Sequence, residues 1–132
     1  MPATDAAVDR EAITAAVQLY IDGSADGDVE KLTEAFDERA WMFGRLGEER
    51  VDMPITSMIE LVAAQPMNAT GTYEAEITSI ASVGDAASVT VEEQGCWGAV
   101  SFVDYFLLSR LDGTWKIVAK SFAHTGGEMP TT

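Results

Sequence analysis

The chain has 132 residues, of which 47% are hydrophobic and 23% charged, which suits one folded domain and is too apolar for a disordered segment. Eight basic residues stand against 22 acidic ones, so the formal net charge is −14. Nucleic acid and anionic membrane surfaces are therefore not expected as partners.

Targeting and disulfide signals are also lacking. Cys96 is the single cysteine, so the chain cannot form an internal disulfide. No apolar run approaches the about 20 residues of a membrane-spanning helix. The first residues have neither the basic nor the apolar region of a signal peptide. We expect a cytoplasmic protein.

Three helices are predicted in the first half of the chain. Apolar residues at helical spacing run through residues 7–23, and a shorter stripe covers residues 29–36, with Asp28 placed to cap it. The segment RAWMFGRL between them and the next helix has the composition of a strand. The third helix is predicted to start at Asp52 and Pro54 and to end before the next proline.

The periodicity changes from helical to strand-like after residue 71. Two hairpins are predicted, with turns at Gly84-Asp85 and Asp112-Gly113. Helices followed by an antiparallel meander predict one α+β domain over residues 1–132. Residues 1–6 and 125–132 are expected to be flexible tails.

The strand VSFVDYFLLSRL is apolar on both faces, although a sheet with one face in water should alternate apolar and polar residues. The helices can cover only one face, so the other needs a different cover, and a second copy of the chain is the simplest. We therefore expect a homodimer through the outer sheet face, with Val103, Tyr105 and Leu107 in the contact.

The turn at Asp112-Gly113 decides which way Asp104 and Lys120 point. A two-residue loop would pair Asp104 with Ser121 and place Lys120 on the opposite face. A three-residue loop with a bulge would pair Asp104 with Lys120, and we favour it because only Gly113 then needs positive φ. Both charged side chains would point inward, under the helices, among aromatic residues that are typical of a small-molecule pocket.

The strings AVQLYIDGSADGD, GDAASVTVEEQ and FVDYFLLSRLDGTWKIVAKSF resemble the nuclear transport factor 2-like superfamily and, within it, the bacterial group called putative lumazine-binding proteins, over about residues 8–125. The resemblance implies a cystatin-like cone, in which three N-terminal helices pack on a curved antiparallel or mixed sheet, and often a dimer through the outer face. It leaves the function open, because this fold hosts isomerases, dehydratases, cyclases and plain binding proteins. We infer no lumazine binding from the group's name.

The chain is more distantly similar to ketosteroid isomerase and polyketide cyclase-like proteins. Ketosteroid isomerase uses a tyrosine and a protonated aspartic acid as hydrogen-bond donors, with a carboxylate base. The resemblance places Tyr20 at the tyrosine and Asp104 at the aspartic acid, whereas the position of the base holds Gly44. That particular isomerase activity is therefore not expected.

Asp104, Tyr20 and His124 are the candidate catalytic residues. Asp104 is either an acid that donates to a ligand or the partner of Lys120 in a structural ion pair, and the ammonium favours its ionised form. Tyr20 is either a donor or a core aromatic. His124 is either a general base at the pocket mouth or a surface residue at a strand end. Lys120 is disfavoured as a nucleophile because its acidic neighbour keeps it protonated.

A strand lets only one of Glu92 and Glu93 point inward. Alignment of the strand with the isomerase pattern favours Glu92, together with Gln94, as the inward residues. Apolar pocket walls are expected from Trp41, Phe43 and neighbouring methionines, and these could equally be ordinary core residues. The residues expected to contact a ligand are Tyr20, Met42, Met58, Val62, Glu92, Gln94, Phe102, Asp104, Phe106, Lys120 and Phe122.

Neither a metal nor a cofactor is expected, since one histidine and one cysteine do not make a usual transition-metal site and the phosphate-loop and nucleophile-elbow motifs are missing. The favoured hypothesis is a protein that holds a small organic molecule in an apolar pocket. The alternatives are a cofactor-independent enzyme of isomerase, dehydratase or cyclase type, and a dimeric scaffold with a vestigial pocket. An enzyme needs a free inward base near a donor pair, and a scaffold would have a filled cone.

Overall fold

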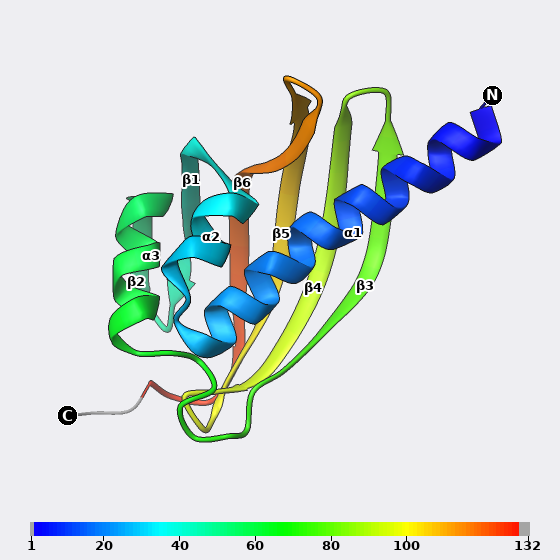
Figure 1. Ribbon diagram of the computed structural model, residues 1–132. Helices are drawn as coiled ribbons and strands as arrows, with labels where there is room; N and C mark the ends of the chain where they lie inside the picture. The colour runs from blue at the N-terminus through cyan, green and yellow to red at the C-terminus, as the bar shows by residue number, and fades with distance from the viewer. Residues whose placement is uncertain (1, 130–132) are drawn as a thin grey trace.

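Three helices lie on one face of a six-stranded sheet in the computed structural model, which describes residues 2–129 and the side chains of residues 8–129 (Figure 1). The elements are α1 (Pro2–Asp26), α2 (Val29–Ala35), β1 (Phe36–Leu46), β2 (Glu49–Pro54), α3 (Ile55–Ala64), β3 (Glu74–Val83), β4 (Ala86–Cys96), β5 (Val100–Leu111) and β6 (Thr114–Gly126). The expected α+β cone, with three N-terminal helices on a curved mixed sheet, is confirmed.

The strand order is β2-β1-β6-β5-β4-β3, and only the β1–β6 pair is parallel. Both predicted hairpins are present. Strand β2 is missing from the sequence prediction, which assigned Asp52 to the start of a helix. The structure places Asp52 in this short edge strand, half of whose residues are exposed, and α3 starts only at Ile55.

The ends of α1 lie outside the predicted residues 7–23. The helix begins at Pro2 and passes through Gly23 to Asp26. Gly23 allows α2 to come close, because a Cβ there would lie 2.8 Å from Leu32 Cγ. Asp28 caps α2 as predicted, accepting from the Lys31 N–H. The flexibility of the two tails stays a prediction, and residues 1 and 130–132 lie outside the described residues.

The turn between β5 and β6 differs from the favoured prediction. Asp112 and Gly113 have φ values of 51° and 81°, so they form a two-residue type I′ turn that pairs Leu111 with Thr114. The three-residue loop is wrong, because the aspartate accepts the left-handed conformation that the prediction reserved for glycine.

A β-bulge in β6 returns Lys120 to the inner face, whereas the two-residue turn alone would have placed it on the outer face. The register shifts at Val118, so that Phe106 pairs with Lys120 and Asp104 pairs with Phe122. Asp104 and Lys120 therefore share the inner face as diagonal neighbours. They are 0% and 4% exposed, which confirms their inward orientation.

The core lies between the helices and the inner face of the sheet, where α1 contributes its buried stripe of Ile13, Val17 and Tyr20. The outer face carries large exposed side chains, including Tyr105 and Leu107. Two residues expected as pocket walls also lie there, and that prediction is wrong: they are Trp41 and Phe43, which are 40% and 46% exposed. Across residues 2–129, no helix combines the length and hydropathy needed to cross a bilayer.

Candidate functional site

Four polar side chains meet beneath α1, on the inner face of the sheet. Tyr20 comes from α1, Glu93 from β4, Asp104 from β5 and Lys120 from β6. All are at most 4% exposed. Three adjacent central strands therefore bring two carboxyl groups and one ammonium to a single helical tyrosine.

The Tyr20 hydroxyl is the centre of this cluster. It accepts a hydrogen bond from Lys120 Nζ at 2.9 Å and lies 3.1 Å from both Glu93 Oε1 and Asp104 Oδ2. Tyr73 donates to Glu93 Oε2 at 2.6 Å. The Lys120 ammonium lies 3.8 Å from Asp104 Oδ1 and 4.8 Å from the centre of the Tyr20 ring. A phenol has one proton, so Tyr20 can donate to only one carboxyl group at a time.

Burial raises the pKa of Asp104 well above its ordinary value, and the charge of Glu93 raises it further, whereas Lys120 lowers it only in part. The short Tyr73–Glu93 contact has the length of a hydroxyl bond to an ionised carboxylate. Burial and the charge of Glu93 therefore both favour the neutral acid form of Asp104. The expectation that Lys120 favours the ionised form of Asp104 did not include the effect of Glu93, whose charge raises the Asp104 pKa.

The prediction that Glu92 and Gln94 point inward is wrong. Both are exposed on the outer face, where Gln94 donates to Glu74 at 2.6 Å. Glu93 points inward because it has the parity of the buried residues Val89 and Val91. The alternation of β4 itself could have identified Glu93, whereas counting against a distant relative missed it.

An apolar cavity of about 190 Å³ adjoins the cluster between α3, the inner face and the C-terminal segment. Asp104 and Lys120 lie in its wall, but Tyr20 lies behind them. Its lining is Met42, Leu46, Val51, Met53, Met58, Leu61, Val62, Gln65, Met67, Trp97, Phe102, Asp104, Lys120, Phe122 and Met129. Phe106, which was expected to contact a ligand, does not line this cavity. It is fully buried, with its ring centre 4.8 Å from that of Tyr20.

The two ionisable residues of the cavity wall, Asp104 and Lys120, have unused hydrogen-bonding capacity. Asp104 Oδ1 is buried and has no hydrogen-bond partner among residues 8–129. Lys120 Nζ makes one short hydrogen bond, to Tyr20, and a 4.0 Å contact with Met58 Sδ, although an ammonium carries three donors. A buried polar group without a partner is costly, so a polar atom in the cavity would be stabilised here.

His124 lies away from the cavity, at whose mouth it was expected as a general base. Its Nδ1 accepts the Gly47 N–H at 2.9 Å, and its Nε2 lies 2.6 Å from the Gly127 carbonyl oxygen. Both ring nitrogens therefore hold backbone segments together, the β1–β2 turn and the chain after β6. His124 is not among the residues that line the cavity.

Gly44 is where the isomerase resemblance would place a carboxylate base. A Cβ at this position would lie 2.6 Å from Phe122 Cδ1 and Cε1. The Phe122 ring occupies the space that a side chain would need, so the position cannot carry a base while that ring stays in place.

No three His, Cys, Asp or Glu side chains within the described residues are grouped so as to hold a metal ion. Cys96 is fully buried, and burial together with the nearby acids raises its thiol pKa to about 12. It is therefore a small core residue that stays protonated.

Three helices on a six-stranded mixed sheet are the cystatin-like fold of nuclear transport factor 2-like proteins. A protein of unknown function of this type from Methylobacillus flagellatus has 31% sequence identity and a TM-score of 0.79, with 89% of this chain and 92% of that chain covered. Another from Shewanella baltica has 24% identity, a TM-score of 0.81 and coverage of 92% and 97%. A structure described as a putative ketosteroid isomerase from Parabacteroides distasonis shares the fold, with 13% identity, a TM-score of 0.60 and coverage of 83% and 84%.

The chain belongs to the putative lumazine-binding family, which matches residues 8–123. None of the curated proteins compared with it matches. The predicted superfamily and group are thereby confirmed.

Proposed function

We propose that the protein binds a small neutral organic molecule, with one ring and one oxygen acceptor, in the cavity beside Asp104 and Lys120. The observation that carries the proposal is the unused hydrogen-bonding capacity of these two residues in an otherwise apolar wall. The ammonium can donate to a ligand oxygen, and so can the neutral acid if its proton is on Oδ1. A carbonyl oxygen satisfies either donor.

The size of the cavity limits the ligand. A cavity of about 150 Å³ holds benzene, so the 190 Å³ here suits one ring with a short substituent. Methionine is abundant in the wall, with Met42, Met53, Met58, Met67 and Met129. Thioether sulfurs make favourable contacts with aromatic rings and adapt to different shapes.

Charge favours a neutral ligand. The Lys120 ammonium is already balanced by Glu93, and the whole chain carries a formal net charge of −14. An anion would enter against this field and leave a net charge buried in the site. A carbonyl oxygen gains the hydrogen bond without that cost.

The family name suggests lumazine as a further candidate. Lumazine is a two-ring pteridine with nitrogen and oxygen atoms along most of its edges. The wall offers mainly apolar side chains with Asp104, Lys120 and Gln65 as polar residues, so most of those atoms would lose their water without a new partner. The cavity therefore supports a less polar ligand.

Two probes of nearly the same shape test the proposal. Acetophenone carries a carbonyl, and α-methylstyrene replaces its oxygen with a CH₂ group. Each would be titrated into the protein with binding followed by calorimetry and by the chemical shifts of the methionine methyl groups. A hydrogen bond to a charged group is worth about 1.5–3 kcal/mol when its partner is removed. The preference for acetophenone should therefore fall by roughly 10- to 100-fold in Lys120→Met.

Two controls separate the site from the rest of the protein. Val62→Phe should block both probes by filling the cavity, whereas Leu111→Ala, an exposed residue at a distant turn, should change neither affinity. The Lys120→Met, Glu93→Gln double variant keeps the buried charges balanced if the single variant unfolds. Failure of both probes to bind at millimolar concentration, or binding that survives Val62→Phe, would contradict the proposal.

The two alternatives have less support. An isomerase, dehydratase or cyclase needs a free base near its donors, but Gly44 carries no side chain and His124 holds backbone groups on both nitrogens. A scaffold with a vestigial pocket would have filled its cone, and the 190 Å³ cavity argues against this. Conversion of a cyclic enone or another activated ketone by the purified protein would favour the enzyme.

A further inference from the structure

The Lys120 ammonium has poor geometry for a purely structural ion pair. Its Nζ makes one short hydrogen bond, to the Tyr20 hydroxyl at 2.9 Å, and Asp104 Oδ1 lies 3.8 Å away. A charge-assisted bond from nitrogen to a carboxylate is about 2.7–2.9 Å long. A buried ion pair repays the loss of water only when its geometry is good. An ion pair alone therefore explains poorly why a lysine is buried here.

The Lys120 Nζ lies at the wall of the cavity. It is 4.0 Å from Met58 Sδ and 5.7 Å from the centre of the Phe122 ring, and both side chains line the cavity. Asp104, whose Oδ1 has no hydrogen-bond partner among residues 8–129, belongs to the same wall. A carbonyl group bound as proposed above would therefore have an amine and a carboxyl group beside it.

We infer that Lys120 is a nucleophile that captures a small aldehyde in the cavity as a protonated imine. The inference rests on the proposed function, because the aldehyde must first occupy the cavity, and it narrows the ligand class to aldehydes with one ring. Lysines that are desolvated in apolar pockets form such imines with carbonyl compounds. The expected obstacle was an ionised Asp104 that keeps Lys120 protonated, but burial and the charge of Glu93 favour the neutral Asp104.

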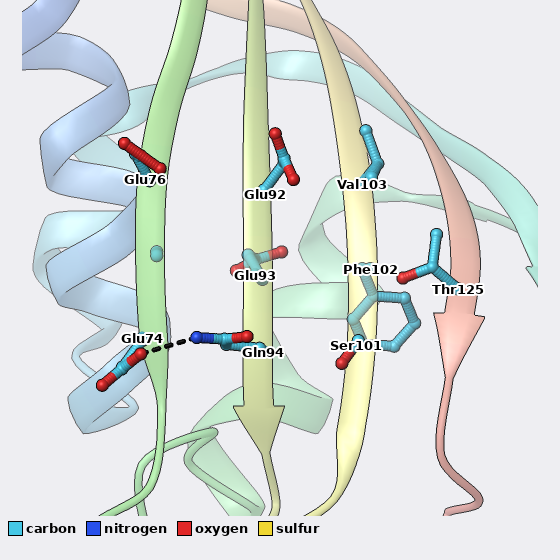
Figure 2. Close-up of a pocket in the computed structure, with 10 residues that line it drawn as sticks. Glu74, Glu76, Glu92, Glu93, Gln94, Ser101, Phe102, Val103 and Thr125 are labelled. Carbon is cyan, nitrogen blue, oxygen red and sulfur yellow. Dashed lines mark hydrogen bonds between the residues drawn. The ribbon is translucent and has the colours of Figure 1, made fainter.

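A hydrogen-bonded path leads from the ammonium to a proton acceptor. Lys120 donates to the Tyr20 hydroxyl at 2.9 Å, and this hydroxyl lies 3.1 Å from Glu93 Oε1. Glu93 is the buried residue of β4 between Glu92 and Gln94, which are exposed on the outer face (Figure 2). Tyr20 passes its own proton to Glu93 and takes one from Lys120, which leaves a neutral amine and a neutral acid. Burial favours this exchange, because it removes two charges from an apolar interior.

The capture reaction conserves both charge and protons. The Nζ lone pair forms a bond to the carbonyl carbon, and the carbonyl oxygen takes the proton of Asp104 to become a hydroxyl. The nitrogen returns one of its protons to Asp104. The C–N double bond then forms, and the hydroxyl leaves as water with that proton. Ammonium and aldehyde thus become protonated imine and water, and one carboxylate of Asp104 and Glu93 still balances the positive charge.

Asp104 is placed to supply the proton. The nitrogen and the oxygen of the intermediate are bonded to the same carbon, so an acid that serves the oxygen must lie close to the amine without bonding to it. Asp104 Oδ1 meets both conditions, since it is 3.8 Å from Lys120 Nζ and has no hydrogen-bond partner among the described side chains. A positioned acid accelerates such a step by about 10²- to 10⁴-fold.

Trapping with benzaldehyde and sodium cyanoborohydride tests the inference. Cyanoborohydride reduces a protonated imine to a stable secondary amine, and peptide mass spectrometry then locates each benzyl group. Two reference lysines, Lys31 and Lys116, are partly exposed and lie in the same chain. At pH 7 Lys120 should be labelled at least about tenfold faster than either of them, because an exposed amine stays protonated at this pH.

Variants and a competitor separate the cavity from the acid. Val62→Phe should abolish the labelling of Lys120 by filling the cavity and should leave the two reference lysines unchanged. Asp104→Asn should slow the labelling of Lys120 at least about tenfold, whereas Asp52→Asn, in the edge strand β2, should leave it within about threefold. α-Methylstyrene, which has no carbonyl, should compete and slow the labelling of Lys120 in the unmodified chain, where no variant has to fold.

The outcomes distinguish this inference from the proposed function. Equal labelling of the three lysines, or labelling of Lys120 that survives Val62→Phe, would overturn the inference. Binding of acetophenone without trapping of benzaldehyde at Lys120 would also overturn it and leave the proposed function intact. Failure of both acetophenone and benzaldehyde would overturn both. Unchanged labelling in Asp104→Asn would show that the amine reacts without this acid, and the assignment of Asp104 would be wrong.

Discussion

Replacing Asp104 by Asn tests whether the buried aspartic acid is neutral in the folded protein. Asn has nearly the shape of a protonated Asp and can still accept from Tyr20. Burial raises the pKa of Asp104 above its ordinary value of 3.8. Such a group stabilises the fold fully below its unfolded pKa and loses that contribution as the pH rises to its folded pKa. The side-chain amide of the variant has no such proton to lose, so Asp104→Asn should become more stable relative to the unmodified chain as the pH rises.

The size of the effect follows from the linkage between protons and folding. Each pH unit between the unfolded and folded pKa values of Asp104 is worth about 1.4 kcal/mol. Between pH 5 and pH 7 the free energy of unfolding of Asp104→Asn should therefore rise, relative to that of the unmodified chain, by at most about 3 kcal/mol. If the folded pKa lies within this range, the rise should stop at that pH.

Urea unfolding followed by tryptophan fluorescence at several pH values and constant ionic strength measures this difference. Asp52→Asn is a suitable control, because its pKa is lowered by hydrogen bonds from Trp41 and Arg50. Asp52 is thus charged in both states from pH 5 to 7, and its substitution should give a pH-independent difference. A flat difference for Asp104→Asn as well would mean that Asp104 is ionised and paired with Lys120, which would refute our assignment.

Two further predictions concern the residues around the cluster. Lys120→Met should cost roughly 3–5 kcal/mol, because it leaves the Glu93 carboxylate buried without a cation, and adding Glu93→Gln should recover much of that loss in the same urea assay. Glu92→Gln, one residue away on the outer face, should change the free energy of unfolding by less than about 0.5 kcal/mol and should not rescue Lys120→Met. If Glu92→Gln did rescue it, Glu92 and not Glu93 would be the buried partner of Lys120. Gly44→Ala should lower the free energy of unfolding by about 1–3 kcal/mol, because its Cβ would overlap the Phe122 ring, and Phe122→Leu should relieve it, whereas additive losses would show that the ring is not the cause.

The sequence was informative where one strand or one helix decides the outcome. Asp28 caps α2 through its local sequence, as predicted. The inward orientation of Lys120 was predicted correctly, although the turn from which it was derived was predicted wrongly. The favoured loop and the observed bulge at Val118 each shift the register by one residue, in opposite directions, and both return Lys120 to the inner face.

The cavity wall could not be predicted, because it depends on distant segments meeting. Met67 follows α3, Trp97 follows β4 and Met129 lies beyond β6, and no local pattern relates them. Trp97 is held by its Nε1 donating to the Gln65 carbonyl oxygen and by its own N–H donating to that of Met67. Such contacts between loops have no periodic signature.

Modification of the single cysteine, Cys96, can report on local opening of this fold. Cys96 is the last residue of β4, next to Trp97 in the cavity wall, and it is fully shielded with a thiol that stays protonated. A thiol reagent can react only after that end of the β4–β5 hairpin opens, so the rate of modification measures how often it opens. An occupied cavity would hold the hairpin closed and slow the reaction, which allows ligands to be screened on the unmodified chain without a label or an assumed chemistry.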